Sequence, residues 1–108
     1  MAEVIETTRE EVREVLESAI QEVNANLENP IAANAPDDTT LYGREGVLDS
    51  LALVSLLSSL EEGIEDRYGL SVTLADERAM SQTRSPFRTV GSLTDYVMLL
   101  IQEHNAQA

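Results

Sequence analysis

The chain has 108 residues, 43% of them hydrophobic, which is enough for one domain with a single core and too little for an enzyme with a deep cleft between lobes. It contains no cysteine and no tryptophan, which excludes a disulfide framework and thiolate chemistry on the polypeptide. Twenty Asp and Glu residues against seven basic ones, all arginine, give a net charge of -13, and this excludes nucleic acid as a partner because Lys and Arg supply the affinity for phosphate.

The first predicted element is an amphipathic helix of roughly twenty residues. It begins at Thr7 or Thr8, where a glutamate three positions later completes a capping box. Pro30 ends it, because proline disfavours helical backbone at the residue before it. Apolar side chains at helical spacing form its buried face: Val12, Val15, Leu16, Ala19, Ile20, Val23 and Leu27.

A long loop with turn-forming residues at Pro36 and 37–40 precedes the second predicted helix. This leucine-rich helix runs from about Ser50 to Arg67, and Gly69 is expected to stop it. Its start falls at Asp49 or Ser50, both of which are ordinary N-cap residues. A serine in the first turn also lies near unpaired N–H groups and the positive end of the helix dipole, where an anionic phosphodiester is favoured.

The remaining predicted elements are a short third helix around Asp76 to Met80 and a last helix that begins near Thr89. Between them, Pro86 in the connection from Ser81 to Arg88 prevents continuous helix. Core positions on the last helix are Val90, Leu93, Val97, Leu100 and Ile101. No internal repeat is visible, so residues 1–108 are predicted to form one all-α domain.

Groups that catalyse reactions are scarce. His104 is the one histidine and is expected to be a solvated residue near the C-terminus. The chain has no lysine for a Schiff base, and no zinc or EF-hand spacing, so no metal site is predicted. Ser50 has no visible base partner in the sequence. We therefore expect a protein that is the substrate of another enzyme rather than an enzyme itself.

Several features in order make the segment from about Leu41 to Ile101 similar to the acyl carrier protein family. The segment 43–51 reads Gly-Arg-Glu-Gly-Val-Leu-Asp-Ser-Leu, and a leucine-rich helix ending in Glu61 and Glu62 follows it. Next come Tyr-Gly-Leu-Ser-Val at 68–72, an acidic pair at 76–77, and a closing helix at 89–97. The resemblance implies a small four-helix bundle with a long loop between helices 1 and 2 and a short third helix.

The resemblance also implies a cofactor and a function. A phosphopantetheinyl transferase would use coenzyme A and Mg²⁺ to attach 4'-phosphopantetheine covalently to Ser50, which Asp49 and Leu51 flank. The arm's thiol would carry acyl groups as thioesters for fatty-acid, polyketide or related specialised acyl metabolism. Acyl-transferring or condensing enzymes with basic docking patches would meet the acidic side chains of Glu61, Glu62, Glu65 and Asp66. The resemblance favours a monomer.

The walls of an acyl pocket would come from the apolar stripe of the second helix: Leu53, Val54, Leu57, Leu60 and Ile64. The same stripe forms an ordinary core if no acyl chain enters it. Ala52 and Ser55 stand where fatty-acid carriers commonly have acids, and Ser58 and Ser59 stand where small or apolar residues are usual. With the longer connection at 81–88, these departures favour a specialised carrier over the main fatty-acid one.

Two other classes of function remain open. An aminoacyl carrier of the peptidyl or D-alanyl type would use Ser50 in the same way and differ in its loading enzyme. A non-carrier acidic docking module would need Ser50 only as a helix cap. No signal peptide and no membrane-spanning segment is recognisable in the sequence, so we expect a cytoplasmic protein without membrane insertion.

Overall fold

The computed structural model describes residues 4–32, 34–43, 46–74 and 86–107. Across these ranges the chain forms three helices, α1 (Arg9–Asn24), α2 (Ser50–Tyr68) and α4 (Val90–Ala106), and no strand. The predicted all-α class is thereby confirmed. The short helix predicted at 76–80 lies outside the described residues, and so do residues 81–85 of the predicted connection at 81–88. The described residues contain three helices.

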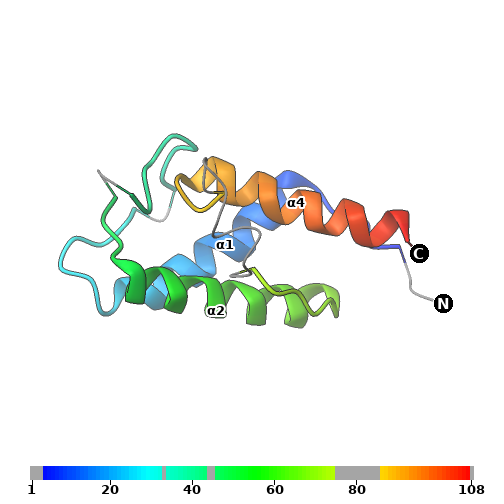
Figure 1. The fold of residues 1–108 in the computed structure, drawn as a ribbon, viewed down its shortest axis with the longest axis horizontal. Coiled ribbons are helices and arrows are strands. Elements are labelled where there is room, and N and C mark those ends of the chain that lie inside the picture. The colour runs from blue at the N-terminus through cyan, green and yellow to red at the C-terminus, as the bar shows by residue number, and fades with distance from the viewer. Residues whose placement is uncertain (1–3, 33, 44–45, 75–85, 108) are drawn as a thin grey trace.

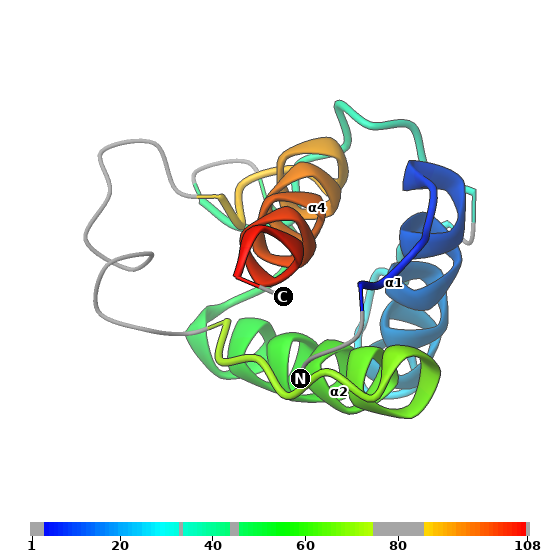
Figure 2. The ribbon, with the colours of Figure 1, turned by 90° about the vertical axis from the view of Figure 1, so that its right-hand side faces the viewer.

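Helix α1 packs against both other helices. α2 and α4 run from left to right in Figure 1, and α1 runs in the opposite sense, inclined to both. Figure 2 views the molecule from the right-hand side of Figure 1, with α4 nearly end-on and α1 crossing the line of α2. None of the helices built from the described residues is both long and apolar enough to cross a membrane.

The core is made from one face of each helix and from apolar side chains of the loops. Leu41, Leu74 and Phe87 are the loop residues that are buried most completely. The apolar face predicted for α1 is buried, apart from Leu27, which lies beyond the helix and is half-buried. The helices contribute these buried side chains: Val12, Val15, Leu16, Ala19, Ile20 and Val23 from α1, Leu53, Leu56, Leu57, Leu60 and Ile64 from α2, and Val90, Leu93, Tyr96, Val97 and Ile101 from α4.

Helix α1 ends earlier than its sequence predicts. Its N-cap is Thr8, which accepts the backbone N–H of Glu11 as expected, but it has 16 residues and stops at Asn24. The amide group of Asn24 donates to the carbonyl of Ile31 at 2.8 Å and accepts the N–H of Ile31 at 2.8 Å. The predicted extension towards Pro30 is therefore wrong, because these two bonds fold the chain back against the end of the helix.

The long loop between α1 and α2 is fastened to the N-terminus of α4. The N–H of Leu41 donates to the carbonyl of Arg88 at 2.7 Å, and the N–H of Val90 donates to the carbonyl of Thr39 at 3.0 Å. The carboxylate of Asp37 pairs with Arg9 at 2.9 Å and with Arg13 at 2.7 Å, both on α1. Arg13 also donates to the carbonyl of Ala35. These contacts fix the course of the chain just before α2 begins.

Candidate functional site

The first turn of α2 has a complete N-cap. Asp49 has extended backbone angles, and its carboxylate accepts the N–H of Ala52 at 2.8 Å. Ser50 is the first residue of the helix, and Gly69 ends it with φ 66° in the left-handed region. The predicted start and end of this helix are confirmed to within one residue. Asp49 is the cap, so Ser50 is not needed for that role.

The hydroxyl of Ser50 is exposed at the start of α2. Among the described residues its one hydrogen-bond partner is the hydroxyl of Tyr42, 3.2 Å away. No hydrogen bond joins it to a carboxylate or an imidazole of the described residues. This partner is a hydroxyl rather than a general base such as a carboxylate or an imidazole, so Ser50 lacks the activated geometry of a nucleophile that catalyses its own reaction. Its exposure makes the hydroxyl accessible from the surface of the protein.

Three apolar side chains near the start of α2 are exposed. Leu51 is 78% exposed, Val54 48% and Val47 45%. Val47 and Leu51 border a surface hollow of about 390 Å³, whose lining is Val23, Asn26, Leu27, Val47, Asp49, Leu51, Ala52 and Ser55. Exposed apolar groups gathered in one place are typical of an interaction site, and Leu51 follows Ser50 directly in the chain.

The residues predicted for an acyl pocket divide into two groups. Leu53, Leu57, Leu60 and Ile64 are buried, each at most 1% exposed, and they belong to the packed core. Val54 is not among them, since it is about half exposed. Ser58 is exposed and Ser59 faces a hollow between α1 and α2. Neither serine therefore brings a hydroxyl into the core.

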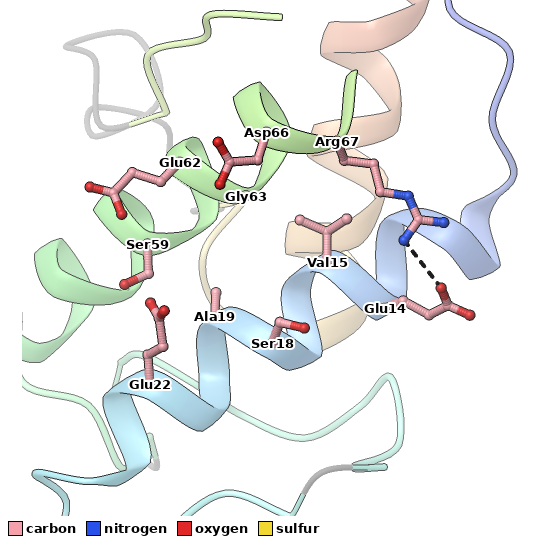
Figure 3. Close-up of a pocket in the computed structure, with 10 residues that line it drawn as sticks. All are labelled: Glu14, Val15, Ser18, Ala19, Glu22, Ser59, Glu62, Gly63, Asp66 and Arg67. Atoms are coloured by element: carbon pink, nitrogen blue, oxygen red, sulfur yellow. Dashed lines mark hydrogen bonds and ion pairs between the residues drawn. The ribbon is translucent and has the colours of Figure 1, made fainter. Parts of the chain in front are cut away.

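The four predicted docking acids also have different surroundings. The carboxylate of Glu61 accepts the N–H of Leu74 at 2.7 Å, so it holds the chain that leaves α2. Glu65 is exposed on the surface. Glu62 and Asp66 line a hollow of about 530 Å³ between α1 and α2 (Figure 3).

That hollow, which we call the α1–α2 groove, has acidic side chains from both helices. Glu22 extends from α1 towards α2, and Glu14 is paired with Arg67 at 3.4 Å (Figure 3). The complete lining is Glu14, Val15, Ser18, Ala19, Glu22, Ser59, Glu62, Gly63, Asp66 and Arg67. Nothing in the sequence indicated that Glu22 of α1 shares a groove with acids of α2.

Tyr42 was likewise not predicted as part of the site. It lies in an irregular loop eight residues before Ser50, where no helical or strand period relates the two positions. His104 is half-buried on α4. Across the described ranges, no group of three or more His, Cys, Asp or Glu residues is arranged to hold a metal ion.

Comparisons of the chain with protein-family models, with curated proteins and with solved structures give no significant match. The chemistry of the site must therefore be argued from its own geometry. That geometry is an accessible hydroxyl at a helix N-terminus, an exposed apolar border beside it, and an acidic groove along the same helix.

Proposed function

We propose that this protein is a carrier that holds acyl intermediates as thioesters on a 4'-phosphopantetheine arm attached to Ser50. The observation that carries the proposal is the exposed hydroxyl of Ser50 at the first residue of α2, in a helix whose cap is supplied by Asp49 instead. The similarity of residues 41–101 to acyl carrier proteins supplies the identity of the arm. In this account the protein is a substrate and a carrier rather than an enzyme.

Attachment is a phosphoryl transfer to Ser50. Its Oγ attacks the phosphorus of coenzyme A that bears the pantetheine, the bond from that phosphorus to 3',5'-adenosine bisphosphate breaks, and the serine proton passes to a base of the transferase, with Mg²⁺ as the transferase's metal. The new phosphodiester carries a negative charge at the positive end of the helix dipole. In the described part of the chain, the N–H groups of Ser50 and Leu51 have no hydrogen-bond partner and are free to face it.

The surface around Ser50 suits basic partners with an apolar contact. A net charge of -13 and the acids of the α1–α2 groove attract a positively charged surface and repel a second copy of the chain. Leu51 and Val54 offer apolar area at the point where the arm would leave. A phosphopantetheinyl transferase and acyl-transferring or condensing enzymes with basic patches fit this description, and a monomer follows from the self-repulsion.

A thiol assay tests the proposal, because the chain has no cysteine of its own. Protein incubated with coenzyme A, Mg²⁺ and a broad-specificity phosphopantetheinyl transferase, then freed of coenzyme A, is expected to contain one reactive thiol per chain. Ser50→Ala should contain none, and Ser58→Ala, which changes another exposed serine of α2, should behave as the wild type. A thiol in the Ser50→Ala protein would contradict the assignment of the site.

A second candidate is an acidic docking module without an arm. The complete cap formed by Asp49 and the N–H of Ala52 favours it, since this bond explains Asp49 at the start of the helix without any modification of Ser50. In this case the folded wild-type protein would gain no thiol with any transferase, while it would still bind basic partners through the α1–α2 groove.

A further inference from the structure

Backbone hydrogen bonds hold the segment that carries Tyr42 near the start of α2. The N–H of Tyr42 lies 3.3 Å from the carbonyl of Arg88, next to the stronger bond from Leu41 to the same carbonyl. On the other side, the N–H of Leu48 donates to the carbonyl of Leu41 at 3.0 Å, which closes the loop on itself. Leu41 and Leu48 are both buried. The half-buried ring of Tyr42 is thus held between two anchored segments.

The described residues before and after positions 44–45 bring the backbone of Tyr42 close to that of Leu48. A Cβ added at Gly46 would lie 2.5 Å from the carbonyl oxygen of Leu41, so only glycine permits the chain to pass this closely. Tyr42 and Leu48 also form an isolated parallel bridge. As a result, the phenol is held 3.2 Å from Ser50 Oγ while Ser50 itself begins a rigid helix.

We infer that the Tyr42 hydroxyl is a positioning group for the modification of Ser50, and that it binds the phosphodiester afterwards. This inference rests on the proposed function. In this arrangement, before transfer, the O–H of Tyr42 donates to Ser50 Oγ, which leaves the serine proton free to face the base of the transferase and a lone pair of Oγ free to face the phosphorus that it must attack. The phenol does not remove the proton, which goes to the base of the transferase.

After transfer the O–H of Tyr42 changes its acceptor. Ser50 Oγ has then lost its hydrogen and can no longer donate, whereas the phenol of Tyr42 keeps its O–H. The non-bridging oxygens of the phosphodiester carry the negative charge and are the best acceptors within reach. A hydrogen bond from a phenol to an anionic oxygen is shorter and stronger than one between two neutral hydroxyls. Tyr42 would therefore set the direction in which the arm leaves the protein.

The chain provides a matched control for this idea. The hydroxyl of Tyr68 also pairs with a hydroxyl, that of Thr7, at 2.6 Å. Tyr68 is half-buried, as Tyr42 is, but it is the last residue of α2 and so lies at the opposite end of the helix from Ser50. Tyr42→Phe and Tyr68→Phe each delete one paired phenolic oxygen and leave the ring in place.

Steady-state kinetics of modification with coenzyme A, Mg²⁺ and a phosphopantetheinyl transferase test the role in positioning. For Tyr42→Phe we expect kcat to fall roughly three- to tenfold, the effect of losing one neutral hydrogen bond, with KM for the carrier unchanged. Tyr68→Phe should match the wild type. After modification, the ³¹P chemical shift of Tyr42→Phe should differ from that of the wild type, and the shift of Tyr68→Phe should not. A loss of packing elsewhere in the protein would not produce this difference.

A measurement on the wild type alone guards against a misfolded variant. With ¹³C-labelled tyrosine, the Cζ resonance of Tyr42 should shift on modification, and those of Tyr68 and Tyr96 should not. If the wild type is modified but this resonance, the ³¹P shift and kcat of Tyr42→Phe all stay unchanged, the inference is overturned and the carrier proposal stands. If the wild type cannot be modified at all, both are overturned together.

Discussion

The backbone N–H of Gly91 donates to the carbonyl of Asp37 at 2.8 Å, which joins the first turn of α4 to the loop that leads to Ser50. A Cβ on Gly91 would lie 2.8 Å from the Cβ of Asp37 and 3.0 Å from its carbonyl oxygen. Glycine is therefore required here by a close approach of two backbones and not by its own backbone angles. The loop and α4 are packed without space for even one methyl group.

Gly91→Ala is expected to lower the free energy of unfolding by about 1–3 kcal/mol, because overpacking costs more than the helix propensity of alanine returns. Urea denaturation followed by circular dichroism measures this. Gln102→Ala, an exposed change on the same helix, is the control and should stay within about 0.5 kcal/mol of the wild type. A Gly91→Ala protein as stable as the control would show that the loop and α4 are not in close contact.

Asp49 and Ser50 are neighbours, but only Asp49 caps α2, so the two residues should affect stability differently. Asp49→Ala should cost about 1 kcal/mol of unfolding free energy, since it removes the acceptor for the N–H of Ala52. Ser50→Ala should cost less than about 0.5 kcal/mol, because its side chain is exposed and does not cap the helix. Equal losses at both positions in thermal or urea unfolding would contradict the assignment of the cap to Asp49.

Helices α1 and α2 approach closely at Gly63. A Cβ at this position would lie 2.9 Å from Cγ1 of Val15, and a valine in a helix has little freedom to rotate away. We predict that Gly63→Ala and Val15→Ala are coupled by about 1 kcal/mol or more, with the alanine at 63 tolerated far better once the valine methyls are gone. A double-mutant cycle of unfolding free energies measures the coupling, and strictly additive effects would argue against the close packing.

Neutralising the α1–α2 groove should weaken docking of a basic partner. Glu62→Gln combined with Asp66→Asn is expected to raise KM for the carrier in phosphopantetheinylation by about two- to tenfold at low salt, because each exposed charge pair contributes about 0.2–1 kcal/mol. Added salt should shrink the difference, since exposed charges are screened. Glu103→Gln, an exposed acid on α4, serves as the control. A KM that does not depend on salt would point to an apolar interface instead.

The helices could be predicted where local chemistry alone decides their ends. Thr8, Asp49 and Thr89 are caps whose side chains bond the N–H three residues later, and Gly69 adopts the left-handed angle that its position suggested. These signals lie within a few residues of one another, so periodicity and cap preferences are enough to find them.

Features that depend on distant contacts could not be predicted. The early end of α1 follows from the bonds of Asn24 to a residue seven positions later, and the pairing of Tyr42 with Ser50 follows from the anchoring of the loop to Arg88. Glu61 was expected to be a docking acid, and its bond to the N–H of Leu74 is likewise invisible in a pattern of charges. In each case, the tertiary course of a loop brings the partners together.

The intact mass of the protein shows directly whether Ser50 receives a phosphopantetheine arm. Wild type and Ser50→Ala would be incubated separately with coenzyme A, Mg²⁺ and a broad-specificity phosphopantetheinyl transferase. The intact mass of each protein would be measured by mass spectrometry before and after the incubation. We expect the mass of the wild type to rise by one phosphopantetheine and the mass of Ser50→Ala to stay unchanged. An unchanged mass for folded wild-type protein with several transferases, or an equal gain in both proteins, would contradict it.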